Sequence, residues 1–227
     1  MKKIISLTLI VGLLLFGGYV FFEPEIIKGE SAADSITVTQ AVTAEITISA
    51  PPDVALSPSI PGMTGGTSNS TDDTTWTVTT NSSTGYALTL KKNHLLRLGD
   101  GGTDRQFDDY PTATPLDFNW VAPGTGGERF GFNCVAGADV IQKYRNATDA
   151  AGNPASPCNT AGGDVSAGYC WNGIPTDPTT EEIARRTSAT PAAGVATSIR
   201  FRAQAAGSNN LNSGTYTTTI TATATVL

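Results

Sequence analysis

The chain has 227 residues, a formal net charge of −6 and only 15% charged residues. No stretch concentrates lysine and arginine, which excludes a face that could neutralise several phosphates of a nucleic acid. One histidine and three cysteines leave little material for a metal centre or for acid–base catalysis. The abundant threonine, together with 24 glycines and 13 prolines, favours an all-β protein with long loops.

The N-terminus has the pattern of an export signal. Two lysines precede residues 4–22, an uncharged run that would span about 28 Å as a helix, close to the thickness of a bilayer core. The lysines predict an N-terminus in the cytoplasm and the rest of the chain outside. Residues 31–33 suit signal peptidase but lie far from the apolar run. Residues 1–33 are therefore either a signal peptide or a retained N-terminal membrane anchor, and both interpretations remain open.

Either interpretation places the protein outside the cytoplasmic membrane. We expect an extracellular or cell-surface protein that touches a membrane only through residues 4–22, if these are not cleaved.

From residue 34 onward the clearest signal is alternation of apolar and polar residues at both ends of the chain. Residues 36–48 and 215–226 alternate in this way, which is typical of strands with one buried face. Residues 76–90 and 195–226 are each interrupted by a turn sequence and predict two hairpins. These signals predict an antiparallel immunoglobulin-like or fimbrial-like β-sandwich over residues 34–227, preceded by the N-terminal hydrophobic helix.

The first predicted strand is too long for one straight strand. Residues 36–48 would extend roughly 43 Å, against ~17–20 Å for a typical strand. Either the strand bends near Gln40 and Ala41 and crosses between the sheets, or part of it pairs with another molecule. The interruption of the apolar alternation at Gln40 favours the bend.

The middle of the chain, residues 93–191, is rich in Gly, Pro, Asp and Asn. We interpret it as a loop-rich insertion of the same domain, because no linker borders it. Short helical turns are expected at residues 138–145 and 181–186, the second beginning with a capping-box pattern.

The three cysteines fit an exported protein. Cys158 and Cys170 enclose a short loop rich in glycine, which favours a disulfide between them. Cys134 is left unpaired in this scheme, although its pairing with either of the other two stays open. A zinc site is not expected, because three thiols and a distant His94 lack the spacing of ligand pairs.

The search for a catalytic centre gives no candidate, and we expect neither an enzyme nor a cofactor. His94 is the only histidine, and no Gly-x-Ser-x-Gly pattern is present. A loop rich in aspartate is a weak calcium candidate without the spacing of an EF-hand. Its carboxylates are Asp100, Asp104, Asp108 and Asp109.

Residues 76–88, 198–203 and 213–220 together resemble uncharacterised exported β-sandwich surface proteins of small-genome uncultivated bacteria. The resemblance implies a displayed β-sandwich and brings no known activity. The last strand, residues 213–220, is also similar to that of spore-coat-U-type fimbrial subunits. The chain departs from the fimbrial pattern because it has no cysteine near its first strand and carries a longer central insertion.

These features predict an exported cell-surface structural or adhesive β-sandwich without catalytic activity, with cell-surface or self-association partners. One alternative is an extracellular carbohydrate-binding module or glycoside-active enzyme, in which Trp120 and Trp171 stack on a sugar. Another is a subunit of a fimbria-like polymer. Exposed rings at Trp120 and Trp171 would favour the sugar site, and buried rings the structural role.

Overall fold

The computed structural model describes residues 33–70, 72–99, 106–112, 116, 119–145, 147–148, 154–155, 158, 170–208 and 211–227. The chain divides into two units, Met1–Val42 and Thr43–Leu227. The expected hydrophobic helix, residues 4–22, lies outside the described residues, as does the rest of the predicted signal or anchor segment except Ala33. No helix within the described ranges is long and apolar enough to cross a membrane. Residues 33–42 of the first unit form no strand, and Ile36, Val38 and Val42 are 81–85% exposed.

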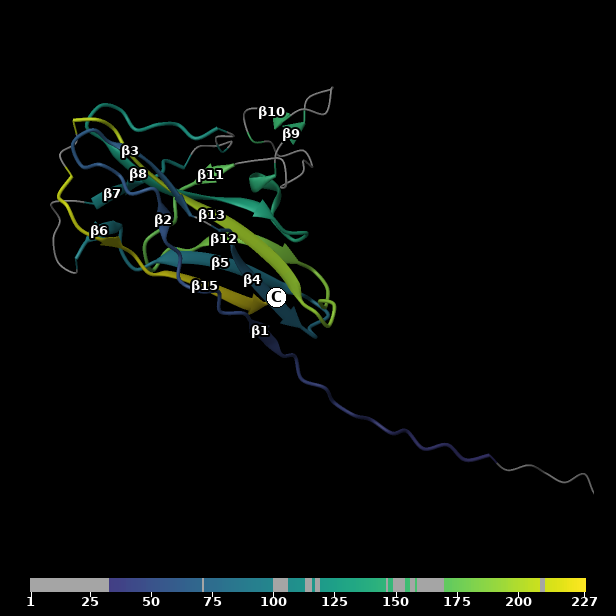
Figure 1. Ribbon diagram of the computed structural model, residues 1–227. Helices are drawn as coiled ribbons and strands as arrows, with labels where there is room; N and C mark the ends of the chain where they lie inside the picture. Colours follow the sequence, from purple (N-terminus) through teal and green to yellow (C-terminus); the bar gives the residue numbers. More distant parts are fainter. Residues whose placement is uncertain are drawn as a thin grey trace, which may run out of the picture. The chain divides into compact units, whose positions relative to one another are not determined.

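The second unit is all-β and consists mainly of two sheets (Figure 1). The large sheet has the order β1-β4-β13-β8-β7-β6-β14, with β2, β3 and β11 attached at its sides. Its strands are β1 (Ile46–Ile48), β2 (Leu56–Ser57), β3 (Gly66–Ser70), β4 (Thr74–Thr80), β6 (Leu96–Leu98), β7 (Gln106–Asp109), β8 (Glu128–Ala136), β11 (Trp171–Asn172), β13 (Val195–Ala205) and β14 (Tyr216–Thr217).

The small sheet has the order β12-β5-β15, with β12 at Glu181–Arg186, β5 at Tyr86–Lys92 and β15 at Ile220–Val226. A separate ribbon pairs β9 (Ala147–Thr148) with β10 (Pro154–Ala155), and η1 (Gln142–Tyr144) is a single 3-10 turn. The strand pairs of the described part are antiparallel except for β7 and β8, which run parallel.

The two sheets enclose one hydrophobic core. Alternate residues of β13 from Thr197 to Ala205 are buried, and the residues between them are half-buried. The buried side of β13 lies opposite Phe130, Phe132 and Cys134 of β8, so these side chains share a face of the large sheet. Tyr86, Leu88 and Leu90 of β5 belong to the same core cluster from the side of the small sheet. The alternation in the sequence thus becomes two apolar faces packed together.

Two pairs of consecutive strands connect the sheets at one end. β5 continues into β6, and β14 continues into β15, so the paired segments pass from one sheet to the other. The change of sheet occurs at Asn93, whose Oδ1 accepts a hydrogen bond of 2.9 Å from the Thr219 amide. The Thr218 hydroxyl donates to the carbonyl of His94 at 2.6 Å. These bonds replace ladder bonds where the strands bend.

The structure corrects several expectations. The two predicted hairpins, residues 76–90 and 195–226, are wrong, because β4 and β13 belong to the large sheet whereas β5 and β15 belong to the small sheet. Residues 181–186 form β12 rather than a helical turn, because a bulge after Glu182 buries both Ile183 and Ala184 and so disguises the two-residue alternation. Within residues 138–145 only η1 is helical. The first strand is limited to β1, so the predicted bend near Gln40 between two sheets is wrong.

Candidate functional site

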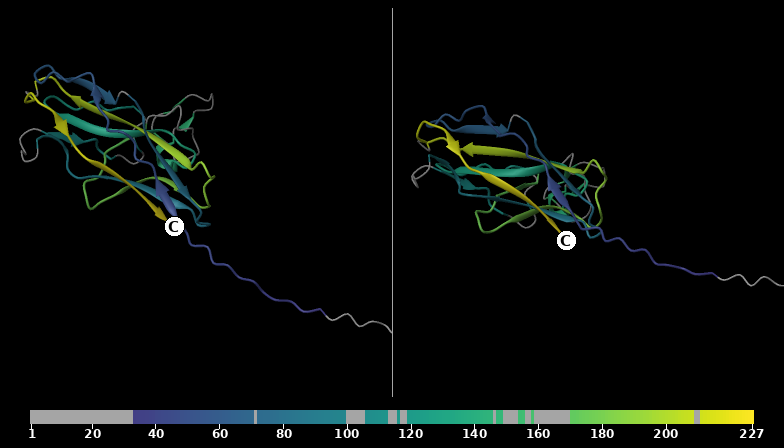
Figure 2. Two further views of the ribbon diagram at one scale, coloured as in Figure 1. Left: turned by 60° about the horizontal axis from the view of Figure 1, so that its bottom comes forward. Right: turned by 90° about the horizontal axis from the view of Figure 1, so that it is seen from below.

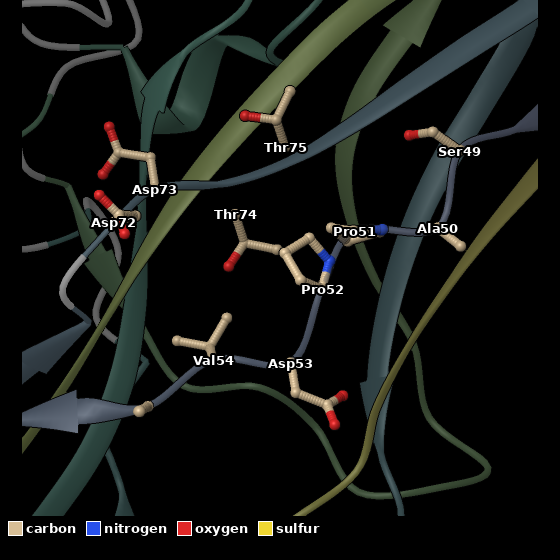
Figure 3. A pocket seen from close by; sticks show the side chains of 11 residues that line it. Ser49, Ala50, Pro51, Pro52, Asp53, Val54, Asp72, Asp73, Thr74 and Thr75 are labelled. Carbon is tan, nitrogen blue, oxygen red and sulfur yellow. The ribbon is translucent and has the colours of Figure 1, made fainter.

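A pocket of about 310 Å³ lies at an edge of the large sheet, between residues 49–55 and 72–75 (Figure 3). β3 and β4 follow one another along one side of β13, and β2 and β1 pair with their outer edges. The outer pair of strands is interrupted at residues 49–55 and the inner pair at residues 72–73, at the same position along the sheet edge. Pro51 and Pro52 explain the outer break, because proline cannot donate a ladder hydrogen bond. The pocket is therefore a gap in the sheet edge.

The chemistry of this pocket is weakly acidic. Asp53, Asp72 and Asp73 are the carboxylates among its lining residues, and Asp73 already pairs with Arg200 at 2.8 Å. The lining residues include no histidine or cysteine that could activate a nucleophile. Nor do the described ranges contain a group of three His, Cys, Asp or Glu residues that could hold a metal ion. The pocket matches none of the residues that the sequence nominated.

An aromatic and arginine cluster lies on the outer face of the large sheet. Trp171 of β11 is opposite Asn133, and Asn133 is opposite Arg200 of β13, so all three share the face away from the main core. Trp120 contacts Trp171 edge to face, with ring centroids 4.8 Å apart. The same Trp120 ring lies 4.7 Å from the ring of Tyr110.

Both nominated tryptophans pack against other side chains of the molecule. The Arg202 guanidinium lies 4.7 Å from the centroid of Trp171 and 5.4 Å from that of Trp120. The Trp120 indole N–H donates to Oε1 of Gln204. Trp171 is 2% exposed, and Trp120 is half-buried. The structure thus brings the two nominated tryptophans together, but in a packed cluster rather than on an open platform.

The close packing of this cluster depends on Gly131 of β8. A Cβ atom at this position would lie 2.7 Å from Cβ of Tyr110 and 2.9 Å from the carbonyl oxygen of Asn172. A larger residue would therefore push Tyr110 away from the sheet and from Trp120.

The four calcium candidates do not form a site in the described part of the chain. Asp100 and Asp104 lie outside the described residues. Asp108 and Asp109 are successive residues of β7, so their side chains point to opposite faces of the strand. Asp108 is exposed, whereas Asp109 pairs with Lys92. These two carboxylates cannot converge on one cation.

Lys92 is a buried lysine that the sequence did not single out. Its side chain is fully buried, and its ammonium donates to Oδ1 of Asp109 and to the carbonyl of Ile174. Burial raises the pKa of Asp109, and the neighbouring ammonium of Lys92 opposes this rise. The pair joins β5 of the small sheet to β7 of the large sheet.

The structure contains a disulfide between Cys158 and Cys170, the pair that the sequence favours, with the Cα atoms 5.7 Å apart. Cys134 is a free cysteine, buried beside Phe132 in the core. Burial raises the pKa of its thiol, so it is an unreactive core residue at neutral pH.

A buried polar network, which no sequence pattern predicts, holds the segment after β8 against β12. The hydroxyl of Tyr144, itself fully buried, donates to Glu181 and accepts a 3.0 Å hydrogen bond from Asn172. Lys143 pairs with the same Glu181 carboxylate. Burial raises the pKa of Tyr144, so the tyrosine stays a hydrogen-bond donor.

This network covers one edge of the small sheet. Ile141 donates its amide to the carbonyl of Ile183 at 3.0 Å, and Arg185 donates to the carbonyl of Asp139 at 2.8 Å. The carboxylate of Asp139 accepts from the hydroxyl of Tyr86 at 2.9 Å and pairs with a guanidinium of β12 at 3.2 Å. The free edge of β12 is thus shielded by residues 139–141.

The opposite edge of the small sheet is β15, which pairs with β5 over its whole length. No strand pairs with its other edge within the described ranges. Its apolar residues, from Ile220 to Val226, are half-buried, and Thr221, Thr223 and Thr225 are exposed. β1 lies beside β15 without a strand pairing between them. Figure 2 shows the two strands side by side close to the C-terminus.

Comparison of the chain with protein-family models, curated proteins and solved structures gives no significant match.

Proposed function

We propose that the protein is an exported cell-surface structural or adhesive module without catalytic activity, built as an immunoglobulin-like or fimbrial-like β-sandwich. The two sheets around one core support the sandwich, as do the strands that change sheet at Asn93. The N-terminal sequence and the disulfide between Cys158 and Cys170 support export.

The observation that favours this function over a sugar site is the burial of Trp171. Stacking on a sugar needs an open ring face, and the ring of Trp171 is 2% exposed. Arg202 and Trp120 pack against that ring. The aromatic cluster therefore stabilises the outer face of the large sheet instead of binding a ligand.

Two measurements on the full-length chain test the proposal. Protease added to intact cells that express the protein should digest residues 43–227, whereas a cytoplasmic marker should survive. Soluble polysaccharides should not bind the exported protein, and the variant Trp120→Ala should lose stability without changing this result. Protection of the chain from external protease would refute export. Polysaccharide binding that Trp120→Ala abolishes in a folded protein would establish the carbohydrate-binding alternative.

A second candidate, a subunit of a fimbria-like polymer, is favoured by a different observation. The edge of β15 has no strand partner in the described part of the chain, and an apolar, alternating segment at residues 36–42 lies outside every strand. An unpaired edge and an unpaired strand-like segment are the two halves of an intermolecular sheet.

A further inference from the structure

The edge of β15 lacks the features by which soluble proteins protect a free strand. Natural edges carry charged residues, prolines or bulges, or they are covered by other segments. The seven residues of β15 contain no charge and no proline, and their pairing with β5 has no register shift. The edge of β12 is covered by residues 139–141, and the edge formed by β1 and β2 is interrupted at Pro51 and Pro52.

The side of the sandwich next to this edge is incompletely covered. Ile220, Ala222 and Ala224 of β15 pack against the core yet remain half-buried. Ile46 of the neighbouring β1 is also half-buried, and Ile48 is 37% exposed. Apolar side chains from both sheets thus stay accessible along the same margin, where one additional strand beside β15 would cover them.

Residues 36–42 have the length and pattern of such a strand. They are uncharged and, like β15, seven residues long. Ile36, Val38 and Val42 share one side of an extended chain and are 85%, 85% and 81% exposed. The other side carries Thr37 and Thr39, which would lie next to the exposed threonines of β15.

We propose that residues 36–42 of one molecule add as a strand to the free edge of β15 in a second copy of the chain. This inference rests on the proposed structural function and names its partner. The donating segment and the accepting edge are different surfaces, so the contact is head-to-tail and extends into a chain of molecules unless the rotation closes a ring.

A second copy fits the edge better than the same molecule does. The side chain of Asn81 accepts a hydrogen bond from the amide of Glu45 at 2.7 Å and donates to the carbonyl of Thr43 at 3.0 Å. Ile46 then pairs with Thr80, so the chain is fixed from Thr43 onward. Folding back onto β15 would use about two residues of the 36–42 segment for a turn, which shortens the strand that remains.

Paired lysine substitutions test which face of the segment is buried. Val38→Lys places a charge on the face that should turn toward the core, beside the half-buried apolar residues of β15, whereas Thr39→Lys places the same charge on the opposite, solvent-facing side. For the exported full-length chain in mild detergent, Val38→Lys should lower the fraction of oligomer about tenfold or more, because a buried unpaired ammonium is costly. Thr39→Lys should stay within about twofold of the wild type.

Neither substitution threatens folding, because the side chains of Val38 and Thr39 are exposed. Gln40→Val completes the apolar face of the segment and should increase the oligomer several-fold. Equal oligomer fractions for Val38→Lys and wild type would overturn the proposal. If the oligomer fractions are equal and both chains are still digested by protease on intact cells, the inference fails while the proposed function stands.

Cysteine cross-linking locates the accepting edge. A chain with Thr39→Cys, mixed with a chain with Thr223→Cys, should form a disulfide-linked dimer on mild oxidation. The matched control is Thr187→Cys, because Thr187 is also an exposed threonine but follows β12 instead of lying in β15. Equal linkage to both positions would overturn the assignment of the edge. Linkage only within one molecule carrying both Thr39→Cys and Thr223→Cys would show that the segment folds back.

Discussion

The two edges of the small sheet differ, although both flank the same strand, β5. β12 carries Glu181, Glu182, Arg185 and Arg186, contains a bulge and is covered by residues 139–141. β15 carries only threonine, alanine and two branched apolar residues, and no strand covers its outer edge in the described ranges. The segment between β8 and β12 therefore protects one edge and leaves the other available for contact.

The comparison also separates two ways in which a sequence specifies a strand. β15 has regular alternation and a complete ladder with β5, so it needs no further contacts to keep its register. β12 has irregular alternation and depends on contacts with η1 and with the segment at Asp139. Tertiary contacts compensate for a weak local pattern at β12.

Matched isoleucine truncations should show the largest difference between the edges. Ile183→Ala in β12 removes a fully buried side chain and should lower the free energy of unfolding by about 3 kcal/mol. Ile220→Ala in β15 removes a half-buried side chain and should cost about 1 kcal/mol. Urea denaturation of both variants in the monomeric Val38→Lys background measures the difference. Equal losses would mean that the β15 edge is covered as completely as the β12 edge.

Breaking the ion pair at the end of β5 should affect both edges together. Asp109→Ala leaves the buried Lys92 ammonium without its carboxylate and should cost about 2–3 kcal/mol, since Asp109 itself is partly exposed. Lys92→Met in the same chain should recover most of this loss. Hydrogen exchange should accelerate equally in β12 and β15, and acceleration confined to one edge would show that the pair supports that edge alone.

Much of the β-sheet scaffold could be predicted from local alternation. Strands β4, β5 and β15 appear in the sequence as regular alternation bounded by turn residues, but the alternation does not show that β4 and β5 belong to different sheets. The loop closed by Cys158 and Cys170 was recognisable from its length and composition. In each case the signal depends on neighbouring residues only.

The remaining features depend on contacts between distant residues. Ile183 and Ala184 look like part of a helix until the bulge against β5 is known. The alternation of residues 36–42 predicts a strand, but nothing local shows whether a partner is present. The burial of Trp171 and the pairing of Lys92 with Asp109 both arise from contacts between residues far apart in the chain, which periodicity does not encode.

Removing the cover of the β12 edge should have an intermediate effect. Asp139→Ala leaves the hydroxyl of the buried Tyr86 without its acceptor and should cost about 1–2 kcal/mol. The amide of Arg185 donates to the backbone carbonyl of residue 139, and its exchange should accelerate as this segment loosens, while exchange in β15 stays unchanged. Tyr86→Phe is the control, since it removes the donor and should make the Asp139→Ala substitution less costly. Faster exchange in β15 as well would contradict independent edges.

The smallest expected effect is a difference in pH dependence between the edges. Hydrogen bonding to the Arg185 guanidinium holds the pKa of Glu182 below its ordinary value of 4.5, and the nearby charge of Lys143 acts in the same direction. A lowered folded-state pKa gives stability that is present above the ordinary pKa and lost as the pH falls through the folded value. Between pH 6 and pH 3, local opening of β12 should therefore become easier, while β15, which has no titratable side chain, should change less. Hydrogen exchange corrected for intrinsic rates measures both edges in one experiment. Glu182→Gln should remove the excess acid sensitivity of β12, and an unchanged pH profile in this variant would assign the sensitivity to another carboxylate.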